Sequence, residues 1–238
     1  MSRKALTLSF AITAVLGCQS TNGGTQASTM NSLSAAEQQA GWKLLFDGKT
    51  LNGWRNYRKT TVSPGWTVVD GILTLSGKDA GDIITADKYR NFELALDWRI
   101  GEGGNSGILY RGTEDNDYIW QSAPEMQILD NDRHPDGKRE VTSAGSVFDV
   151  YGVPHDVVHP AGQWNSIRIV ANGDHIEHWM NGKKVVDYTV GSDDWKARVA
   201  ASKWKSVPTY GKSPEGYIGL QDHGDKVEFR NIRIRVLP

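Results

Sequence analysis

Two short segments of the chain carry polar side chains that could do chemistry, at positions where a β-sheet normally presents apolar ones. They are NSGILYR (residues 105–111) and EMQILD (residues 125–130). Their Ile, Leu and Tyr content predicts strands, and because side chains alternate between the two faces of a strand, Glu125 and Gln127 share a face. Buried polar groups cost free energy unless they are paired, so this pair predicts a site.

The spacing of the acidic residues limits the chemistry that this face can perform. Glu125 and Asp130 are five positions apart, which in a strand separates them by roughly 17 Å and puts them on opposite faces. The two carboxyl groups of an ordinary glycosidase stand about 5 to 10 Å apart, so these residues cannot form such a pair. Glu125 and Gln127, roughly 7 Å apart on one face, suit one base and one amide that binds a sugar.

Two further residues could act on the same substrate. Arg111 could hold an anion or a developing oxyanion, because its guanidinium donates hydrogen bonds in a fixed geometry; a surface salt bridge is the alternative interpretation. His223 follows Gln221 and Asp222 at the end of a predicted strand and precedes Gly224. It is therefore expected in a loop, where a neutral imidazole could accept or deliver a proton near pH 7.

A β-sandwich is expected to position these residues, because strand follows strand from Trp42 onward. Asp70-Gly71 and Asn181-Gly182 lie between β-rich runs and predict two-residue hairpin turns. Strands and helices do not alternate, so we expect two antiparallel sheets and not a parallel doubly wound sheet. One helix is predicted over residues 193–201, with Ser192 as its N-cap. The expected strands are residues 66–69, 72–75, 92–100, 107–111, 126–129, 164–171, 176–180, 183–188, 217–221 and 227–236.

The last predicted strand changes its apolar face along its length. Val227 and Phe229 share one parity, whereas Ile232 and Ile234 share the other. A β-bulge near Arg230-Asn231 would have this effect, and bulges often lie beside sites because they re-aim side chains. A strand that twists from core to edge is the alternative.

The composition argues against some partners and favours others. The chain has 27 basic and 28 acidic residues and a net charge of -1, with no clustering of one sign, so nucleic acid is not an expected partner. About 200 residues after the leader suffice for one domain. Nine Trp and eight Tyr are expected mainly in the core and at hairpin edges, with one or two available for stacking on a sugar.

The N-terminus predicts export. Arg3 and Lys4 precede an apolar run at residues 5–16, which is too short for a permanent membrane span and suits a secretory signal. The run ends in VLGC, which resembles a bacterial lipoprotein box with Cys18 as the acylated residue; a plain secretory signal with an incidental cysteine is the alternative. We expect a signal peptide at residues 1–17, a flexible tether at 18–40 and one domain at 41–238. The domain would be lipid-anchored to a bacterial membrane, in the periplasm or at the cell surface.

Several short motifs stand in an informative order along the predicted domain. They are WKLLFDG (42–48), LNGW (51–54), NSGILYR, EMQILD, AG and WN (161–162 and 164–165), HWMNG (178–182), GYIGLQDHG (216–224) and FRNI (229–232). Together they resemble the 3-keto-disaccharide hydrolase domain family over nearly all of the predicted domain. The resemblance implies a concanavalin A-like jelly roll, an all-β fold that agrees with the expected sandwich.

The resemblance also implies cleavage of a glycosidic bond in a sugar that is already oxidised at C3. A carbonyl at C3 acidifies the proton on C2, so that a base can remove it, the C1 substituent can depart, and water can add back. Glu125 or His223 is the expected base, with the other as acid, and Arg111 is the third expected catalytic residue. The residues expected to position the sugar or its enediolate are Asn105, Gln127, His178, Gln221 and Asp222.

Cofactor, partners and alternative functions complete the expectations. The sequence requires no cofactor, although a divalent ion bound by Asp222 and His223 could stabilise the enediolate. The expected partners are a small-molecule or oligosaccharide substrate, a membrane reached through the lipid anchor, and a sugar 3-oxidoreductase. A non-catalytic carbohydrate-binding module and an ordinary glycoside hydrolase on the same fold stay open. An ordinary hydrolase would need a second carboxylate on the face of Glu125, for which Asp222 is the obvious candidate.

Overall fold

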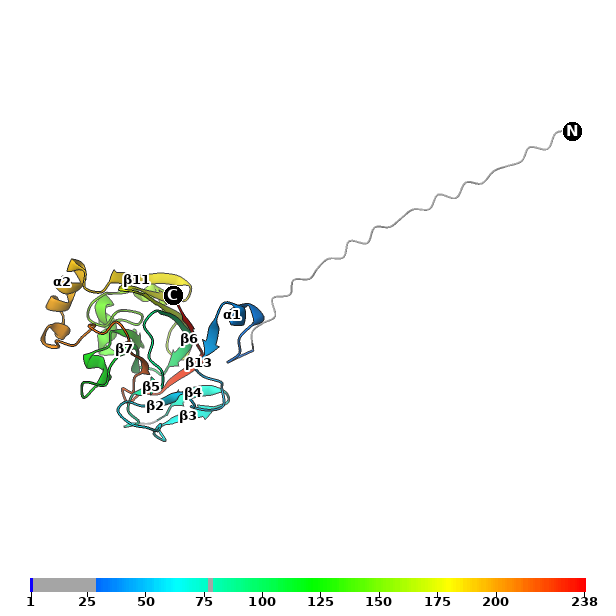
Figure 1. The fold of residues 1–238 in the computed structure, drawn as a ribbon, viewed down its shortest axis with the longest axis horizontal. Coiled ribbons are helices and arrows are strands. Elements are labelled where there is room, and N and C mark those ends of the chain that lie inside the picture. The colour runs from blue at the N-terminus through cyan, green and yellow to red at the C-terminus, as the bar shows by residue number, and fades with distance from the viewer. Residues whose placement is uncertain (2–28, 77–78) are drawn as a thin grey trace.

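A computed structural model describes Met1, residues 29–76 and residues 79–238 of the chain (Figure 1). Residues 2–17 of the predicted signal peptide, the predicted lipidation site Cys18 and the first part of the predicted tether lie outside the described residues. Within the described part, no helix is long and apolar enough to cross a membrane. The chain from Trp42 onward forms two antiparallel sheets around a shared core.

The larger sheet consists of β1 (Trp42–Leu44), β3 (Trp66–Val69), β4 (Ile72–Leu75), β6 (Phe92–Ile100), β9 (Asn165–Asn172), β10 (His175–Met180), β11 (Lys183–Thr189) and β13 (Val227–Val236). The smaller sheet consists of β2 (Trp54–Asn56), β5 (Ile83–Thr85), β7 (Asn105–Gly112), β8 (Glu125–Leu129) and β12 (Tyr217–Leu220). Their orders are β11-β10-β9-β6-β13-β4-β3, with β1 beside β13, and β2-β5-β12-β7-β8. The helices are α1 (Ala35–Gln39), α2 (Asp193–Ala201) and five 3-10 turns, η1 (Ile119–Gln121), η2 (Pro135–Lys138), η3 (Glu140–Thr142), η4 (His155–Val157) and η5 (Lys203–Ser206).

The predicted turns and helix are confirmed. Asp70-Gly71 joins β3 to β4, and Asn181-Gly182 joins β10 to β11. All four turn residues have positive φ, as a type I′ hairpin turn requires. Helix α2 begins after Ser192, whose Oγ accepts a hydrogen bond from Trp195 N at 3.1 Å.

The smaller sheet is covered on both of its faces. One face packs against the larger sheet through residues such as Ile108, Met126 and Ile128, which are fully buried. The other face is partly covered by Ile119 of η1, which packs on Leu109 in a second apolar cluster. Because both faces are covered, β7 and β8 are buried at every position, and polar side chains on the second face are enclosed by protein.

The described part of the predicted tether, residues 29–40, contains a short helix and contacts the domain through Asn31 and Glu37. Helix α1 begins with a capping box formed by Ser34 and Glu37, and Glu37 also pairs with Arg233 of β13 at 3.2 Å. Asn31 and Asn231 bind each other reciprocally, since each backbone N–H donates to the side-chain oxygen of the other at 2.8 Å. The described part of the predicted tether is therefore attached to the domain.

The predicted β-bulge in the last strand is confirmed. The pairing of β13 with β6 shifts between Arg230 and Arg233, and Asn231 between them has a φ of 56°. Asn231 Nδ2 donates to Asp97 Oδ2 at 2.7 Å. The bulge re-aims Asn231 toward the N-terminal segment and not toward the residues predicted to do chemistry.

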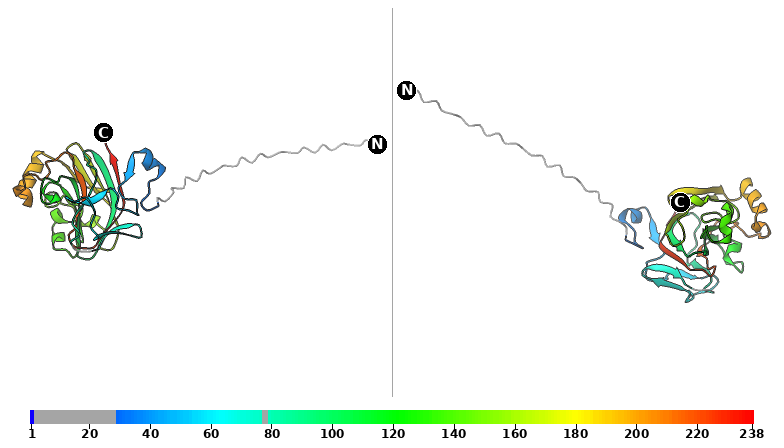
Figure 2. Two further views of the ribbon diagram at one scale, coloured as in Figure 1. Left: turned by 60° about the horizontal axis from the view of Figure 1, so that its bottom comes forward. Right: turned by 180° about the vertical axis from the view of Figure 1, so that it is seen from behind.

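Helices α1 and α2 lie at opposite ends of the sandwich in each view (Figures 1 and 2).

Candidate active site

The second face of the smaller sheet carries four of the eight predicted site residues: Asn105, Glu125, Gln127 and Gln221. Strand β7 pairs with β8 so that Gly107 is opposite Gln127 and Leu109 is opposite Glu125. On the other side of β7, Gln221 N donates to Gly107 O at 2.9 Å. Gln221, Gly107 and Gln127 therefore form one row across the sheet, with Glu125 in the next row. The prediction that Glu125 and Gln127 share a face is confirmed.

A cavity of about 620 Å³ opens over this face. It brings together the segment before β5, the turn η1, the start of β8, the turn η5 and the loop between β12 and β13. Four of the predicted site residues line it: Glu125, Gln221, Asp222 and His223. The other lining residues are Gly81, Asp82, Tyr118, Trp120, Lys203, Trp204, Ser206 and Val207.

Glu125 provides a buried carboxyl group in the cavity wall. Its side chain is only 4% exposed, and its carboxyl group has no hydrogen-bond partner among the described residues. Burial raises the pKa of Glu125 to about 8; the positive charge of Lys203 lowers this pKa, while Asp82 and Asp136 raise it. A carboxyl group with such a pKa can exchange a proton near neutral pH, as a general acid or base must.

Gly107 leaves the space that the side chain of Glu125 occupies. A Cβ atom at position 107 would lie 2.8 Å from Glu125 Cδ and 2.9 Å from Glu125 Cγ, both closer than a van der Waals contact. Any other residue in the middle of the row would therefore displace the carboxyl group. The glycine within NSGILYR therefore leaves room for the carboxyl group of Glu125 to lie across β7.

Three amide side chains near this position have buried polar atoms without a partner. Among the described residues, Gln127 has no partner for either Nε2 or Oε1, and Asn105 Oδ1 and Gln221 Oε1 are also unpaired. Gln127 is 1% exposed and Asn105 is 4% exposed, and neither lines the cavity itself. Unpaired buried groups are costly, so they indicate a place where a ligand or water completes the hydrogen bonding.

Asp82 and Asp222 form a second acidic part of the cavity. Asp222 N donates to Asp82 Oδ1 at 2.9 Å, and Asp222 accepts from Gly81 N through Oδ2 and from Gly224 N through Oδ1. Burial raises the pKa of Asp82 to about 6; the hydrogen bond from Asp222 N lowers this pKa, and the negative charge of Asp222 raises it. His223 is the exposed neighbour of this pair in the cavity. No motif in the sequence indicated Asp82, which lies far from the other site residues along the chain.

Lys203 is a second residue that the sequence did not indicate. It is the first residue of η5 and follows α2 after one intervening serine. Its Nζ lies 4.0 Å from the ring centre of Phe148 and 4.4 Å from that of Trp204. Burial lowers the pKa of Lys203, whereas Glu125, Asp149 and Asp136 raise it. The Lys-Trp-Lys sequence after the helix is a weak signal that could have pointed to this residue.

Aromatic rings form one side of the cavity. Tyr118 stacks on Trp120 at 5.4 Å, and Tyr118 is 56% exposed. Trp204 stacks on Tyr210 at 4.4 Å, and the stack continues behind the cavity through Trp195, Tyr188 and Tyr151. Most aromatic residues of this group are therefore structural, as expected. Tyr118 and Trp120 are placed where a sugar ring could stack.

Arg111 does not meet Glu125 in the cavity. Its guanidinium donates to two backbone carbonyl groups, Arg90 O through Nε and Nη2 and Gly173 O through Nη2. Arg111 has a φ of 54°, and the pairing of β7 with β12 is irregular beside it. The structure therefore places the guanidinium of Arg111, predicted to hold an anion or a developing oxyanion, outside the cavity, where it joins two loops.

His178 also lies away from the cavity. It is completely buried between the sheets, with Nε2 2.9 Å from Tyr110 Oη and Nδ1 2.9 Å from Gly145 O. Burial lowers the pKa of His178 to about 4, so the imidazole is neutral at physiological pH. Its parity with Ile176 and Met180 in β10 puts it on the core face, and the expectation of sugar binding is corrected to a core hydrogen bond.

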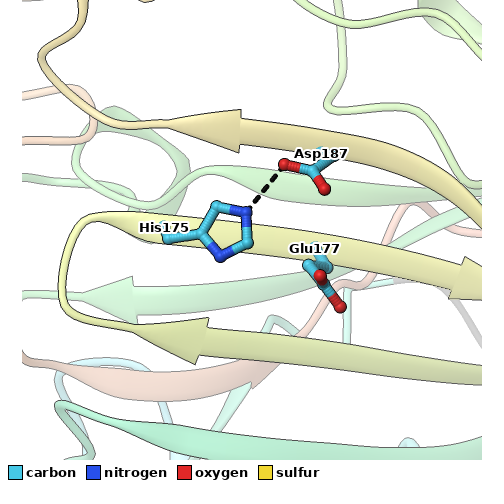
Figure 3. A group of neighbouring side chains, drawn as sticks. All are labelled: His175, Glu177 and Asp187. Atoms are coloured by element: carbon cyan, nitrogen blue, oxygen red, sulfur yellow. Dashed lines mark hydrogen bonds and ion pairs between the residues drawn. The ribbon is translucent and has the colours of Figure 1, made fainter.

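Potential metal ligands gather elsewhere on the molecule. In the described part of the chain, one group of three His, Asp or Glu residues has its ligand atoms within 4.8 Å of one another: His175, Glu177 and Asp187 on β10 and β11 (Figure 3). Lys184 Nζ already pairs with both Glu177 and Asp187. In the cavity, Asp222 and His223, which the sequence suggested as ligands of a divalent ion, both belong to the lining, and each oxygen of Asp222 also accepts a backbone N–H group.

The fold and the cavity define a β-sandwich with an enclosed acidic site on the outer face of one sheet. A family described as "3-keto-alpha-glucoside-1,2-lyase-like domain" matches residues 41–235. The chain is also 37% identical over 243 residues to a 3-keto-disaccharide hydrolase of Bacteroides thetaiotaomicron, with 89% of this chain and 84% of that protein covered. The chain therefore belongs to the 3-keto-alpha-glucoside-1,2-lyase-like family, and the resemblance noted in the sequence is confirmed.

Solved structures of relatives share the fold. A crystal structure from Parabacteroides distasonis, described as a candidate glycosyl hydrolase, matches with a TM-score of 0.83 and 36% identity, covering 88% of this chain and all of that one. A second structure from the same organism, described in the same way, matches with a TM-score of 0.62 and 33% identity over 82% of this chain and 99% of that one. The prediction of a concanavalin A-like sandwich of two antiparallel sheets is confirmed.

Proposed function

We propose that this protein cleaves the glycosidic bond of 3-keto-glycosides or 3-keto-disaccharides by elimination followed by hydration. The observation that carries the proposal is Glu125, a buried carboxyl group with a pKa raised to about 8 in the wall of a cavity large enough for a disaccharide. Asn105 and Gln127, which have unpaired amide atoms, lie on the same face of the sheet. The relative from Bacteroides thetaiotaomicron is named a 3-keto-disaccharide hydrolase, which supports the same class of substrate.

The reaction needs one base and one acid and no oxidant. Glu125, in its ionised form, removes the proton on C2, and the electron pair moves into the C2–C3 bond to give an enediolate. That electron pair then forms the C1–C2 double bond as the C1–O1 bond breaks, and an acid protonates the departing oxygen. Water adds to C1 while C2 regains a proton, so the sum is hydrolysis. His223, at the exposed side of the cavity, is the proposed acid.

The test is turnover of a purified 3-keto-disaccharide in D₂O. Elimination and hydration place deuterium on C2 of the released keto sugar, whereas direct displacement at C1 leaves the C2 hydrogen in place. The free keto sugar, incubated with Glu125→Gln protein, controls for spontaneous exchange. Release without deuterium at C2, or release undiminished in Glu125→Gln, would contradict the proposal.

The structure favours one competing function more than the sequence did. Asp82 and Asp222 both line the cavity of Glu125, so a second carboxyl group is available to an ordinary glycoside hydrolase. That enzyme would cleave the unoxidised disaccharide, which has no acidic C2 proton and should resist the proposed chemistry. A non-catalytic carbohydrate-binding module would bind either sugar and cleave neither.

Two further proposals concern the setting of the reaction. The substrate must be oxidised at C3 before it is cleaved, so we propose that a sugar 3-oxidoreductase acts with this protein. We also propose export and lipidation at Cys18, on the strength of the N-terminal sequence. Membrane fractionation of wild-type and Cys18→Ala protein tests the anchor, since only the wild-type protein should stay with the membrane.

A further inference from the structure

Among the described residues that line the cavity, Lys203 is the one lysine or arginine, and it lies among three carboxyl groups. In the proposed reaction, negative charge develops on the C3 oxygen of the sugar when the C2 proton is removed. Glu125, Asp82 and Asp222 would oppose this charge if no cation were near it. Lys203 is itself exposed, but it lines the cavity, and a cation held where the negative charge develops stabilises the transition state.

The backbone around Lys203 is held in a fixed position. Lys203 N donates to Asp149 Oδ2 at 2.8 Å, and the next residue, Trp204, donates through its backbone N to Ser202 Oγ at 3.1 Å. The indole Nε1 of Trp204 donates to Phe148 O at 2.7 Å. These bonds hold the indole of Trp204 against the backbone of Phe148, and the lysine Nζ lies over the rings of both residues.

The ammonium group of Lys203 lies on aromatic rings and has no carboxylate partner among the described residues. It lies over the rings of Phe148 and Trp204, which attract a cation but accept no ion pair. In the described part of the chain it has no carboxylate partner within salt-bridge distance. Asp149, the acidic residue bound to its backbone, instead pairs with Arg139 at 3.0 Å. The N–H groups of the ammonium are therefore available to a ligand.

We propose that Lys203 is a catalytic residue whose ammonium group donates a hydrogen bond to the C3 oxygen of the bound keto sugar. It stays protonated throughout: it binds the carbonyl oxygen of the substrate and stabilises the enediolate oxygen after the C2 proton has moved to Glu125. When the C1–O1 bond breaks, the C3 carbonyl is restored and the interaction weakens again. This assignment rests on the proposed function.

Steady-state kinetics of Lys203→Met on a 3-keto-disaccharide test the assignment. Loss of one oxyanion donor typically lowers kcat by about 10² to 10³, and we expect a fall of that size with a much smaller change in KM. Lys205→Met is the matched control, because Lys205 lies on the same turn but does not line this cavity. Its activity should equal that of the wild type.

A pH profile separates an electrostatic role from a structural one. The positive charge of Lys203 lowers the pKa of Glu125, which Asp82 and Asp136 raise, and Asp222 and His223 share the cavity. Removal of the lysine charge should therefore move the acidic limb of kcat/KM to higher pH. Lys203→Met with wild-type kcat, or a loss with an unmoved limb, would overturn the inference.

Two further outcomes are informative. If borohydride traps a covalent adduct between Lys203 and the keto sugar, the lysine forms an imine with the sugar and not a hydrogen bond. That result would overturn the assignment. A wild-type protein that is inert on 3-keto-disaccharides would overturn the proposed function together with this inference. An active wild type with an equally active Lys203→Met variant would overturn the inference alone.

Discussion

The carboxyl group of Glu125 lies in the space where Gly107, on the neighbouring strand, has no side chain. A Cβ atom there would be 2.8 Å from Glu125 Cδ. Gly107 has no positive φ, so its backbone would accept other residues. The reason for glycine at this position is therefore the side chain of Glu125 and not the turn chemistry that glycine usually serves.

Gly107→Ala should impair catalysis more than folding. The new methyl group forces Glu125 to move by about 1 Å, and misplacement of that size can cost on the order of 10² in rate. Overpacking should also cost about 1 to 3 kcal/mol in the free energy of unfolding. Gly101→Ala is the control, because its Cβ would be 3.7 Å from the nearest atom, Lys226 O. Equal kcat/KM in the two variants would show that Glu125 needs no such space.

Glu125→Gln should stabilise the fold at alkaline pH. The folded-state pKa of about 8 lies above the ordinary value of 4.5, so the folded protein holds its proton while the unfolded chain loses it. The stability of the wild type therefore falls as pH rises from 4.5 through 8, by at most about 5 kcal/mol. Glu125→Gln cannot lose stability in this way. Thermal unfolding of both proteins at pH 5 and pH 8 tests this: the Tm of the variant should exceed that of the wild type by more at pH 8 than at pH 5. An equal difference in Tm at the two pH values would refute the raised pKa of Glu125.

His178→Leu should lower stability and spare catalysis. The substitution removes the partner of Gly145 O and one partner of Tyr110 Oη, at a cost of about 1 to 3 kcal/mol. The folded-state pKa of about 4 lies below the ordinary 6.5, so the wild type also loses stability as pH falls from 6.5 toward 4. The difference in the free energy of unfolding between the wild type and His178→Leu should therefore become smaller at acidic pH. Denaturant unfolding at several pH values measures this difference. A raised KM in the folded variant would instead show that His178 takes part in binding the sugar.

Asn31→Ala should release the N-terminal segment without affecting turnover. It removes one of the two reciprocal bonds with Asn231 and also the bond from Asn31 Nδ2 to Gly71 O. Hydrogen exchange of residues 29–41 should accelerate, whereas exposed Asn52→Ala, whose side chain forms no hydrogen bond in the described part of the chain, should leave it unchanged. Unaltered exchange in Asn31→Ala would assign the anchoring to α1 and its capping box.

The strands could be predicted because their signals are local. Asp70-Gly71 and Asn181-Gly182 require positive φ, and period-two alternation then fixes which residues share a face. The same rule correctly grouped Glu125 with Gln127. The rule could not have placed Arg111, because one irregular pairing with β12 interrupts the alternation there, which no short stretch of sequence reveals.

Other parts of the site depend on distant segments. Asp82 and Lys203 reach Glu125 only because the segment before β5 and the turn η5 converge over the sheet. Neither residue belongs to a periodic pattern, so strand reasoning could not place them. The bulge at Asn231 was predictable from the change of parity, but its contact with Asn31, 200 positions away along the chain, was not.

The stacked rings behind the cavity give the protein an intrinsic optical reporter. Trp204 is 4.4 Å from Tyr210 and nearly parallel to it, and Tyr210 is in turn stacked on Trp195. Chromophores held this closely and rigidly couple their electronic transitions, which should produce a strong near-ultraviolet circular dichroism band. Because Trp204 also lines the cavity, occupancy of the site should change that band in an unlabelled protein, even for a sugar that is never turned over.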